Sequence, residues 1–173
     1  SIKYLLYGAL ASGTLLWGLS LLYGVSGSLN LYSIHATLTS SYLDPLSLYA
    51  IAMMILFGVG FKMAMAPFHM WAPDVYQGAP TPITAFLTVA PKAAGFALFI
   101  RLFYTTFANP LDSPGAPGEF LHVANLNWPQ VISVLSALTM TGGNLSALFQ
   151  KNVKRLLAYS SIAHVGYLLM GLV

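Results

Sequence analysis

The sequence predicts an all-α membrane protein, a polytopic helical bundle with about five transmembrane helices, and three observations lead to this fold class. Hydrophobic residues make up 57% of the 173-residue chain and charged residues only 6%, whereas soluble domains carry about 25% charged residues. Several apolar stretches are each long enough to cross the hydrocarbon core of a bilayer, for which a helix needs about 20 residues. These stretches are continuously apolar and lack the alternation that is typical of membrane β-strands.

The predicted helices are joined by segments rich in Asn, Ser, Pro and Gly, which are typical of loops. They cover residues 2–23, 46–66 with a short continuation to 76, 83–103, 129–150 and 153–173. Pro45, Pro82 and Pro129 stand at or just before helix starts, where a missing backbone N–H does no harm. We interpret residues 1–173 as a single transmembrane region. Because the chain begins directly at the first helix and ends within the last, we expect a fragment of a longer polypeptide.

Small residues recur at helical spacing in the first and fourth predicted helices. The first helix contains Gly8, Ser12 and Gly13, and the fourth contains Gly142 and Gly143. Small side chains allow helices to approach one another closely in lipid. We therefore expect these positions to lie at contacts between helices.

The second predicted helix contains a lysine and is expected to break near a proline. A single helix from Leu46 to Tyr76 would extend about 46 Å, well beyond a hydrocarbon core of about 30 Å. Pro67 removes a backbone hydrogen bond and clashes with the preceding turn, so we predict the helix break there. A break at membrane depth is tolerated only beside protein or a wet cavity. Lys62 lies about one turn before this break.

Three titratable residues on three different helices are predicted to share one layer of the membrane. Lys92 lies about 14 Å into the third helix, Lys62 about 24 Å into the oppositely directed second helix, and His164 about 16 Å into the last. A lysine at the bilayer centre costs about 2.5–3.5 kcal/mol, so these residues are expected to face protein or water. Lys62 could instead extend to the interface from its helix end, and a lone histidine is more often a packing residue.

The function that such a layer favours is proton transfer. Burial in a low-dielectric site generally lowers the pKa of a lysine, so that its proton becomes exchangeable near neutral pH. We predict that Lys62, Lys92 and His164 translocate protons, together with water and hydroxyl groups. The supporting hydroxyls are those close to the histidine in the sequence, Tyr159, Ser160 and Ser161.

Other kinds of chemistry find little support in the sequence. The chain has no cysteine, which excludes disulfides and cysteine-ligated metals. All four acidic residues lie outside the predicted spans, so nothing indicates a catalytic residue or a metal site. A net charge of +3 is too small and scattered for a nucleic-acid partner. The other histidines, His35, His69 and His122, fall in predicted loops or turns and indicate no site.

The distribution of charge predicts the orientation of the chain. One membrane side, here called the basic side, carries Lys3, Lys151, Lys154 and Arg155. The opposite side holds the predicted loops 24–44 and 104–128 with Asp44, Asp112 and Glu119, and Arg101 lies near that end of the third helix. Because Lys and Arg are in excess in cytoplasmic loops, we predict that the basic side faces the cytoplasm or its equivalent.

Long motifs in the chain resemble the N-type antiporter-like membrane subunits of respiratory complex I, the proton-pumping NADH:quinone oxidoreductase. The matching stretches are FKMAMAPFHMWAPDVYQGAPTPITAFL, PKAAGFALFIRLF and GNLSALFQKNVKRLLAYSSIAHVGYLLMGLV. The resemblance covers nearly the whole chain, and the PDVYQGAPTP motif favours the N-type over the related Mrp sodium/proton antiporters. It implies a fragment of a larger fold with inverted repeats and discontinuous helices.

The resemblance also implies roles for residues and for partners. Lys62 matches the family's lysine in the broken helix, Lys92 its central lysine, and His164 its mid-membrane histidine. The chain would be part of a proton-translocating, non-redox subunit that contacts other membrane subunits of complex I and the lipid bilayer. It would hold no cofactor itself, whereas NADH, FMN, iron–sulfur clusters and quinone would bind in partner subunits. The membrane would be the bacterial inner membrane rather than a mitochondrial inner or thylakoid membrane.

Two other hypotheses stay open at this point. The chain could belong to an Mrp-type Na⁺/H⁺ antiporter of related build, without redox partner subunits. It could also be a membrane scaffold whose lysines have no role in transport, in which case their replacement by alanine would leave transport intact.

Overall fold

The computed structural model describes residues 2–40, 44–109, 121–122 and 126–173, which form seven helices and one short antiparallel ladder. The elements in chain order are α1 (Ile2–Ser26), α2 (Leu31–Ser40), α3 (Pro45–Met63), α4 (Ala72–Gly78), α5 (Thr81–Thr106), β1 (Ala108–Asn109), β2 (Leu121–His122), α6 (Trp128–Leu148) and α7 (Val153–Met170). The loop charges Asp112 and Glu119 lie outside the described residues.

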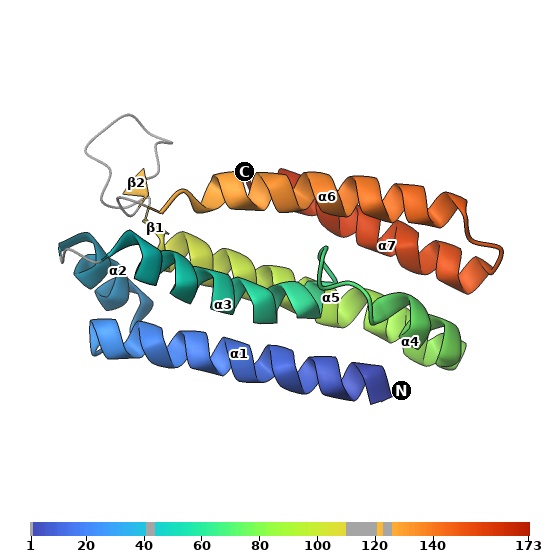
Figure 1. Ribbon diagram of the computed structural model, residues 1–173, viewed down its shortest axis with the longest axis horizontal. Coiled ribbons are helices and arrows are strands. Elements are labelled where there is room, and N and C mark those ends of the chain that lie inside the picture. The colour runs from blue at the N-terminus through green and yellow to red at the C-terminus, as the bar shows by residue number, and fades with distance from the viewer. Residues whose placement is uncertain (1, 41–43, 110–120, 123–125) are drawn as a thin grey trace.

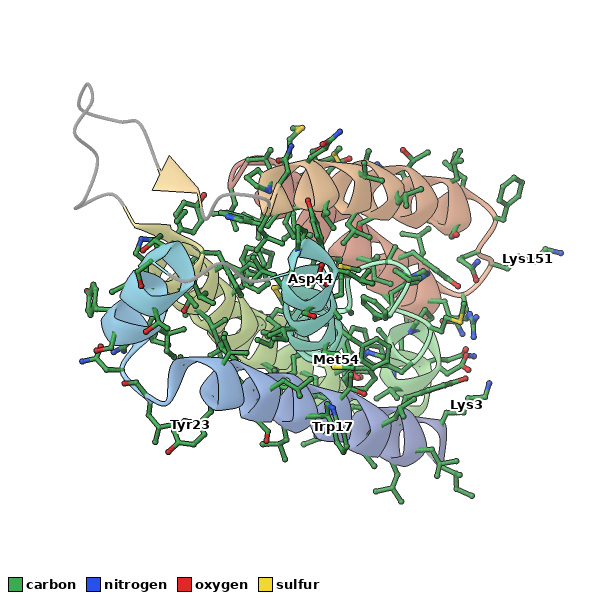
Figure 2. All side chains as sticks on the ribbon, turned by 60° about the vertical axis from the view of Figure 1, so that its left-hand side comes forward. Lys3, Trp17, Tyr23, Asp44, Met54 and Lys151 are labelled. Carbon is green, nitrogen blue, oxygen red and sulfur yellow. The ribbon has the colours of Figure 1, made fainter. Side chains whose placement is uncertain are left out.

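The five longest helices lie side by side along the long axis of the molecule (Figure 1). α3 packs against α1 and α5, α6 packs against α7, and the short α4 also packs against α7. The start of α1, α4 and the α6–α7 turn lie at one end of the bundle, whereas α2, β1 and β2 lie at the other (Figure 1). Figure 2 accordingly shows Lys3 and Lys151 at the same end of the bundle, away from Tyr23.

The prediction of an all-α membrane fold is confirmed. Within the described residues, four helices are long and apolar enough to cross a membrane, namely α1, α3, α5 and α6. The fifth predicted span corresponds to α7, an 18-residue helix outside that group of four. Lys154 and Arg155 in its first turn make α7 more polar than the other spans.

The prediction of a loop over residues 24–44 is wrong, because α2 forms within it. The side chain of Asn30 accepts a hydrogen bond from the backbone N–H of Tyr32 at 3.0 Å, which satisfies a free donor at the helix start. Ile34 and Leu38, one turn apart, are buried against the bundle. His35 therefore lies in a helix, where it is buried with its Nδ1 3.0 Å from the backbone oxygen of Thr106 in α5.

α3 begins at local signals in the sequence and ends at a residue with a left-handed backbone conformation. Asp44 caps its start by accepting a backbone hydrogen bond from the first turn, and Pro45 occupies the first helical position. The helix ends at Met63, because Ala64 adopts a left-handed backbone conformation with φ 59°. The predicted break near Pro67 is confirmed, and the helix stops before the proline because proline disfavours helix in the residues that precede it.

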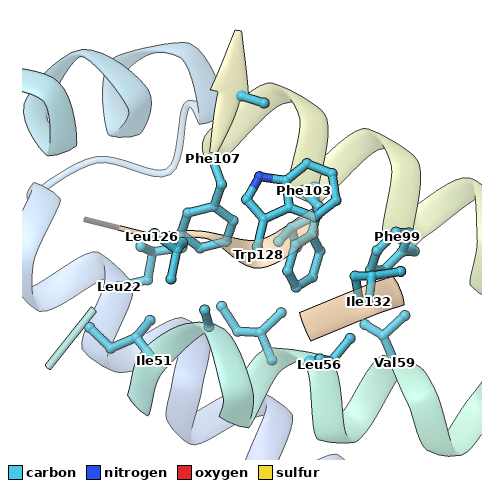
Figure 3. Packing of buried hydrophobic residues seen from close by; sticks show 14 of the residues in the cluster. Leu22, Ile51, Leu56, Val59, Phe99, Phe103, Phe107, Leu126, Trp128 and Ile132 are labelled. Carbon is cyan, nitrogen blue, oxygen red and sulfur yellow. The ribbon is translucent and has the colours of Figure 1, made fainter. Parts of the chain in front are cut away.

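Much of the apolar core lies where α3, α5 and α6 meet (Figure 3). The rings of Phe99 and Phe103 stack with centroids 4.5 Å apart, and the Phe103 ring lies 5.8 Å from that of Trp128. The outer faces are apolar as well, since Leu5 is 70% exposed and Phe149 is 83% exposed. Such outer faces suit contact with lipid or with further protein rather than with water.

Candidate functional site

The break between α3 and α4 is enclosed by protein. The backbone N–H of Ala66 donates to the hydroxyl of Thr139 in α6 at 3.1 Å. The indole N–H of Trp71 donates to the backbone oxygen of Phe61, at the end of α3, at 3.1 Å. These bonds tie the interrupted segment to the helices around it, as a break at membrane depth requires. Pro67 borders an apolar cavity of about 250 Å³ beside the break.

Lys92 is buried in the middle of α5, and its ammonium group is held by α7. Only 6% of the residue is exposed. Its Nζ donates to the hydroxyl of Ser161 at 2.6 Å and to the backbone oxygen of the same residue at 3.1 Å. The Nζ also lies 5.9 Å from the centroid of the Tyr76 ring in α4, within the range of a cation–π interaction.

A cavity of about 500 Å³ between α4, α5 and α7 lies next to Lys92. Its lining includes Ser160, Ser161 and His164 from α7 and Tyr76 from α4. Ser161 precedes His164 by less than one helical turn, so both side chains lie on the same face of α7. The structure therefore places Ser161 between the ammonium group of Lys92 and the cavity that His164 borders.

Lys62 borders a second cavity, of about 340 Å³, that is lined by residues of α1, α3 and α5. Its side chain is exposed in this chain. The same cavity is bordered by Pro91 and Gly95, which lie on either side of Lys92 in the sequence. Lys62 thus lines one cavity and His164 the larger one. Lys92 lines neither, but its sequence neighbours line the first and its hydrogen-bond partner Ser161 lines the second.

Tyr159 and His69 lie apart from this arrangement. Tyr159 is half-buried and packs against an apolar cluster that includes Trp71 and Ala158. His69 is half-buried in the turns between α3 and α4. Of the three hydroxyl residues predicted to support the relay, the structure places Ser160 and Ser161 at the cavity.

Tyr76 borders the site, although no sequence pattern singled it out. Its hydroxyl donates to the backbone oxygen of Leu87 at 3.3 Å. Pro91, four residues after Leu87, has no N–H with which to occupy that oxygen. A proline inside a helix leaves one backbone oxygen without its helical donor. Pro91, directly before the buried Lys92, is therefore the sequence signal that could have indicated a donor from another helix for this oxygen.

An ion-pair cluster on the basic side holds α4 against α1 and α7. One oxygen of Asp74 lies 2.9 Å from Nζ of Lys3, and the other lies 2.8 Å from the guanidinium group of Arg155. Nζ of Lys154 donates to the backbone oxygen of Ala79, just after α4, at 3.2 Å. The hydrogen bonds from Lys3 and Arg155 hold the pKa of Asp74 below its ordinary value.

Replacing Asp74 by asparagine is expected to loosen α4. A partly exposed pair such as Arg155–Asp74 contributes about 0.2–1 kcal/mol, so amide hydrogen exchange in residues 72–78 should rise about two- to fivefold. Because the pKa of Asp74 is lowered in the folded chain, the cluster acts above the ordinary value of 3.8 and is lost as the pH falls through the lowered value. Acidification should therefore loosen α4 in the same way.

The control for this change is Asp44→Asn, which removes a carboxylate from the opposite end of the bundle. It should leave hydrogen exchange in α4 unchanged. If exchange in α4 were the same in Asp74→Asn as in the native protein, the cluster would have no role in holding this helix.

The chain matches a family of membrane proteins. The family model described as NADH:quinone oxidoreductase/Mrp antiporter, transmembrane region, matches residues 1–113 and 118–173. A curated relative, NADH-quinone oxidoreductase subunit N of Anaeromyxobacter sp. (strain Fw109-5), is 52% identical over 180 residues. The match covers 99% of this chain and 34% of the relative, so the chain spans about a third of the relative's length.

Solved structures also contain chains with a similar fold. One is respiratory complex I from Thermus thermophilus with bound aureothin, with 40% identity, a TM-score of 0.75 and coverage of 99% of this chain and 33% of the other. The second is the Mrp complex from Dietzia sp. DQ12-45-1b, with 23% identity, a TM-score of 0.75 and coverage of 97% and 28%. At this lower identity the second likeness shows the fold alone.

Proposed function

Because this chain belongs to the NADH:quinone oxidoreductase/Mrp antiporter transmembrane family, we propose that it is part of a proton-translocating, non-redox membrane subunit of an NADH:quinone oxidoreductase. The relative of 52% identity, named subunit N of that enzyme, supports this assignment within the family. The observation that carries the proposal is Lys92, a buried lysine bonded to Ser161 beside the cavity that His164 borders. A charge at such depth is costly, and residues of this kind typically mark an ion pathway.

In the proposed pathway, protons pass between Lys92 and His164 by way of Ser161 and water. A serine hydroxyl can accept a hydrogen bond from a charged lysine and donate one to a neutral lysine, so Ser161 suits both protonation states. The two ring nitrogens of an imidazole can donate one hydrogen bond and accept another, so His164 can pass protons on through neighbouring water. The cavity of about 500 Å³ is lined mainly by apolar groups, but Ser160, Ser161 and His164 give it polar partners for the water that would join the two groups.

Lys62 supplies the second section of the proposed pathway. It borders the other cavity, which also reaches Pro91 and Gly95 beside Lys92. Protons would move between Lys62 and Lys92 along this cavity, and between Lys92 and His164 along the larger one. Lys92 would thus be the group through which both sections communicate.

The remaining parts of the assembly are proposed on the same basis. The chain would contact other membrane subunits of the enzyme through its exposed apolar faces, and lipid would cover the rest. NADH, FMN, iron–sulfur clusters and quinone would bind in partner subunits, and electron transfer there would drive proton movement here. The membrane would be the bacterial inner membrane, with the basic side in the cytoplasm.

The alternative is a subunit of an Mrp-type Na⁺/H⁺ antiporter, whose structure has a similar fold at 23% identity. Such an antiporter would lack redox partner subunits, since it needs no NADH oxidation. Purification of the complete complex decides between the two: proton uptake that depends on NADH oxidation and quinone supports the main proposal, whereas Na⁺/H⁺ exchange without NADH supports the alternative.

Replacing Lys62 by alanine should strongly reduce proton translocation, because it removes the proton-exchanging group of one cavity. General acid–base groups typically contribute about a hundredfold or more to a proton-transfer rate, so a loss of this order is expected. The measurement is proton uptake by sealed vesicles that contain the complete complex, with NADH oxidation recorded in parallel. Lys151→Ala, an exposed lysine in the α6–α7 turn, is the matched control and should pump normally (Figure 2). Normal pumping by Lys62→Ala would instead favour the scaffold hypothesis for this residue.

A further inference from the structure

Pro91 interrupts the backbone hydrogen bonds of α5 one residue before Lys92. In a regular helix the backbone oxygen of Leu87 would accept a hydrogen bond from the N–H of residue 91, but proline has no N–H. In this structure the hydroxyl of Tyr76 donates to that oxygen at 3.3 Å. A side chain from α4 therefore occupies the acceptor that the proline leaves free.

The ring of Tyr76 is held firmly in this place. The residue is only 1% exposed, and its ring meets that of Trp71 edge-on with centroids 5.9 Å apart. Trp71 is itself bonded to the end of α3 through its indole N–H. Asp74, two residues before the tyrosine, is paired with Arg155 of α7. The hydroxyl bond, the ring contact and the ion pair together fix the direction of the Tyr76 side chain.

The same ring lies 5.9 Å from Nζ of Lys92. The face of an aromatic ring carries negative partial charge and attracts an ammonium group. Ser161 binds the same Nζ from α7. The ammonium group is thus positioned between an aromatic ring of α4 and two oxygens of α7.

We propose that Tyr76 is a positioning residue for Lys92, anchored on the backbone oxygen that Pro91 leaves free. It borders the larger cavity, while its contacts Trp71 and Leu87 border the cavity of Lys62. Tyr76 therefore stands between the two sections of the pathway and keeps the ammonium group beside Ser161. This inference rests on the proposed function, because the position of Lys92 matters only if the residue carries protons.

No charged partner accounts for the position of the Lys92 ammonium group among the residues that line the two cavities, which leaves the ring and hydroxyl of Tyr76. The titratable side chains that line the two cavities are Tyr4, Lys62, Tyr76, Lys154 and His164. These lining groups include no carboxylate that could pair with the ammonium group. A phenol is neutral at physiological pH, so Tyr76 contributes an aromatic face and a hydrogen-bond donor.

The anchor is tested by a double-mutant cycle of Tyr76→Phe and Pro91→Ala. Tyr76→Phe removes the hydroxyl and keeps the ring, and Pro91→Ala restores an N–H that competes for the oxygen of Leu87. Each change should slow NADH-driven proton uptake by about two- to tenfold, the range expected for one hydrogen bond. Because both changes act on the same bond, Tyr76→Phe should cost less than about twofold when Pro91→Ala is already present. If the rate loss of the double variant equalled the product of the two single losses, the two changes would act independently, and the proposed bond from Tyr76 to the oxygen of Leu87 would have no role.

The role of the ring is tested by Tyr76→Leu, compared with Tyr76→Phe. The leucine variant removes the aromatic face, so the charged form of Lys92 loses a favourable contact and the alkaline limb of the pumping pH profile should move down by about one pH unit. The phenylalanine variant keeps the aromatic face, so its pumping rate should depend on pH as in the native enzyme, even though that rate is lower. A purely structural defect would not shift the pH dependence in Tyr76→Leu alone. Identical profiles in Tyr76→Leu and native enzyme would overturn the role of the ring, and if Tyr76→Leu fails to assemble, the double-mutant cycle decides.

A parallel Lys92→Ala variant separates this inference from the proposed function. If Lys92→Ala stops pumping while the Tyr76 and Pro91 variants pump as the native enzyme does, only the positioning role fails. If Lys92→Ala itself pumps fully, the proposed function fails, and the positioning role fails with it.

Discussion

Replacing Lys92 by alanine is expected to stop proton translocation almost completely, with a loss of about a hundredfold or more. The reason is geometric, because the neighbours of Lys92 line one cavity and its partner Ser161 lines the other, and no other titratable side chain is bonded to Ser161 in the described structure. Its removal would leave Lys62 in one cavity and His164 in the other without a connecting group. The measurement is proton uptake by sealed vesicles during NADH oxidation.

Lys92→Arg should impair transfer as well, although it keeps the positive charge. A guanidinium group stays protonated under all physiological conditions and cannot hand its proton on. It is also planar and larger than an ammonium group, so it would not fit the bonds that Ser161 now makes. Ser161→Ala, which keeps the lysine and removes the hydroxyl, should give an intermediate loss. Full pumping by both Lys92→Ala and Lys92→Arg would end the interpretation of Lys92 as a proton carrier.

The break in the second span shows how far the sequence predicts the fold. Length alone requires an interruption between Leu46 and Tyr76, and Pro67 predicts its position to within a few residues. The actual end of α3 depends on contacts distant in the sequence, such as the bond from Ala66 to Thr139, so it could not be read locally. α2 was not predicted for a related reason, since two buried apolar residues one turn apart are a weak pattern in a ten-residue segment.

The site shows the same division between local and long-range information. Membrane depth singles out Lys62, Lys92 and His164, because depth follows from the number of residues and the rise of a helix. Helical direction explains the different positions of the supporting hydroxyls, since Ser161 lies on the face of His164 whereas Tyr159 points to another cluster. Tyr76 could not be found in this way, because its role depends on how α4 folds back onto α5 after the break.

A second large effect is expected at the contact between α6 and α7, where Gly143 faces Ala163. A Cβ atom at Gly143 would lie 2.7 Å from the backbone nitrogen of Ala163 and 3.0 Å from its Cα. Backbone atoms of a facing helix cannot turn aside as a flexible side chain can, so the two helices would have to separate. Gly143→Ala should therefore destabilise the bundle by about 1–3 kcal/mol, the typical cost of overpacking, and Gly143→Leu by more. α7 also carries Ser161 and His164, so proton translocation should fall with stability.

The neighbouring residue, Gly142, provides a matched control in the same helix turn. A Cβ atom there would meet nothing within 4 Å among the described residues. Because alanine favours a helix by about 1 kcal/mol over glycine, Gly142→Ala should leave stability unchanged or raise it. The measurement is the temperature at which the purified complex loses this subunit, together with the amount that assembles in the membrane. If Gly143→Ala and Gly142→Ala behaved alike, the close approach of α6 and α7 would not be what requires glycine at residue 143. Opposite effects of one added methyl group at adjacent residues would show that the helix contact, and not the helix propensity of the chain, determines the result.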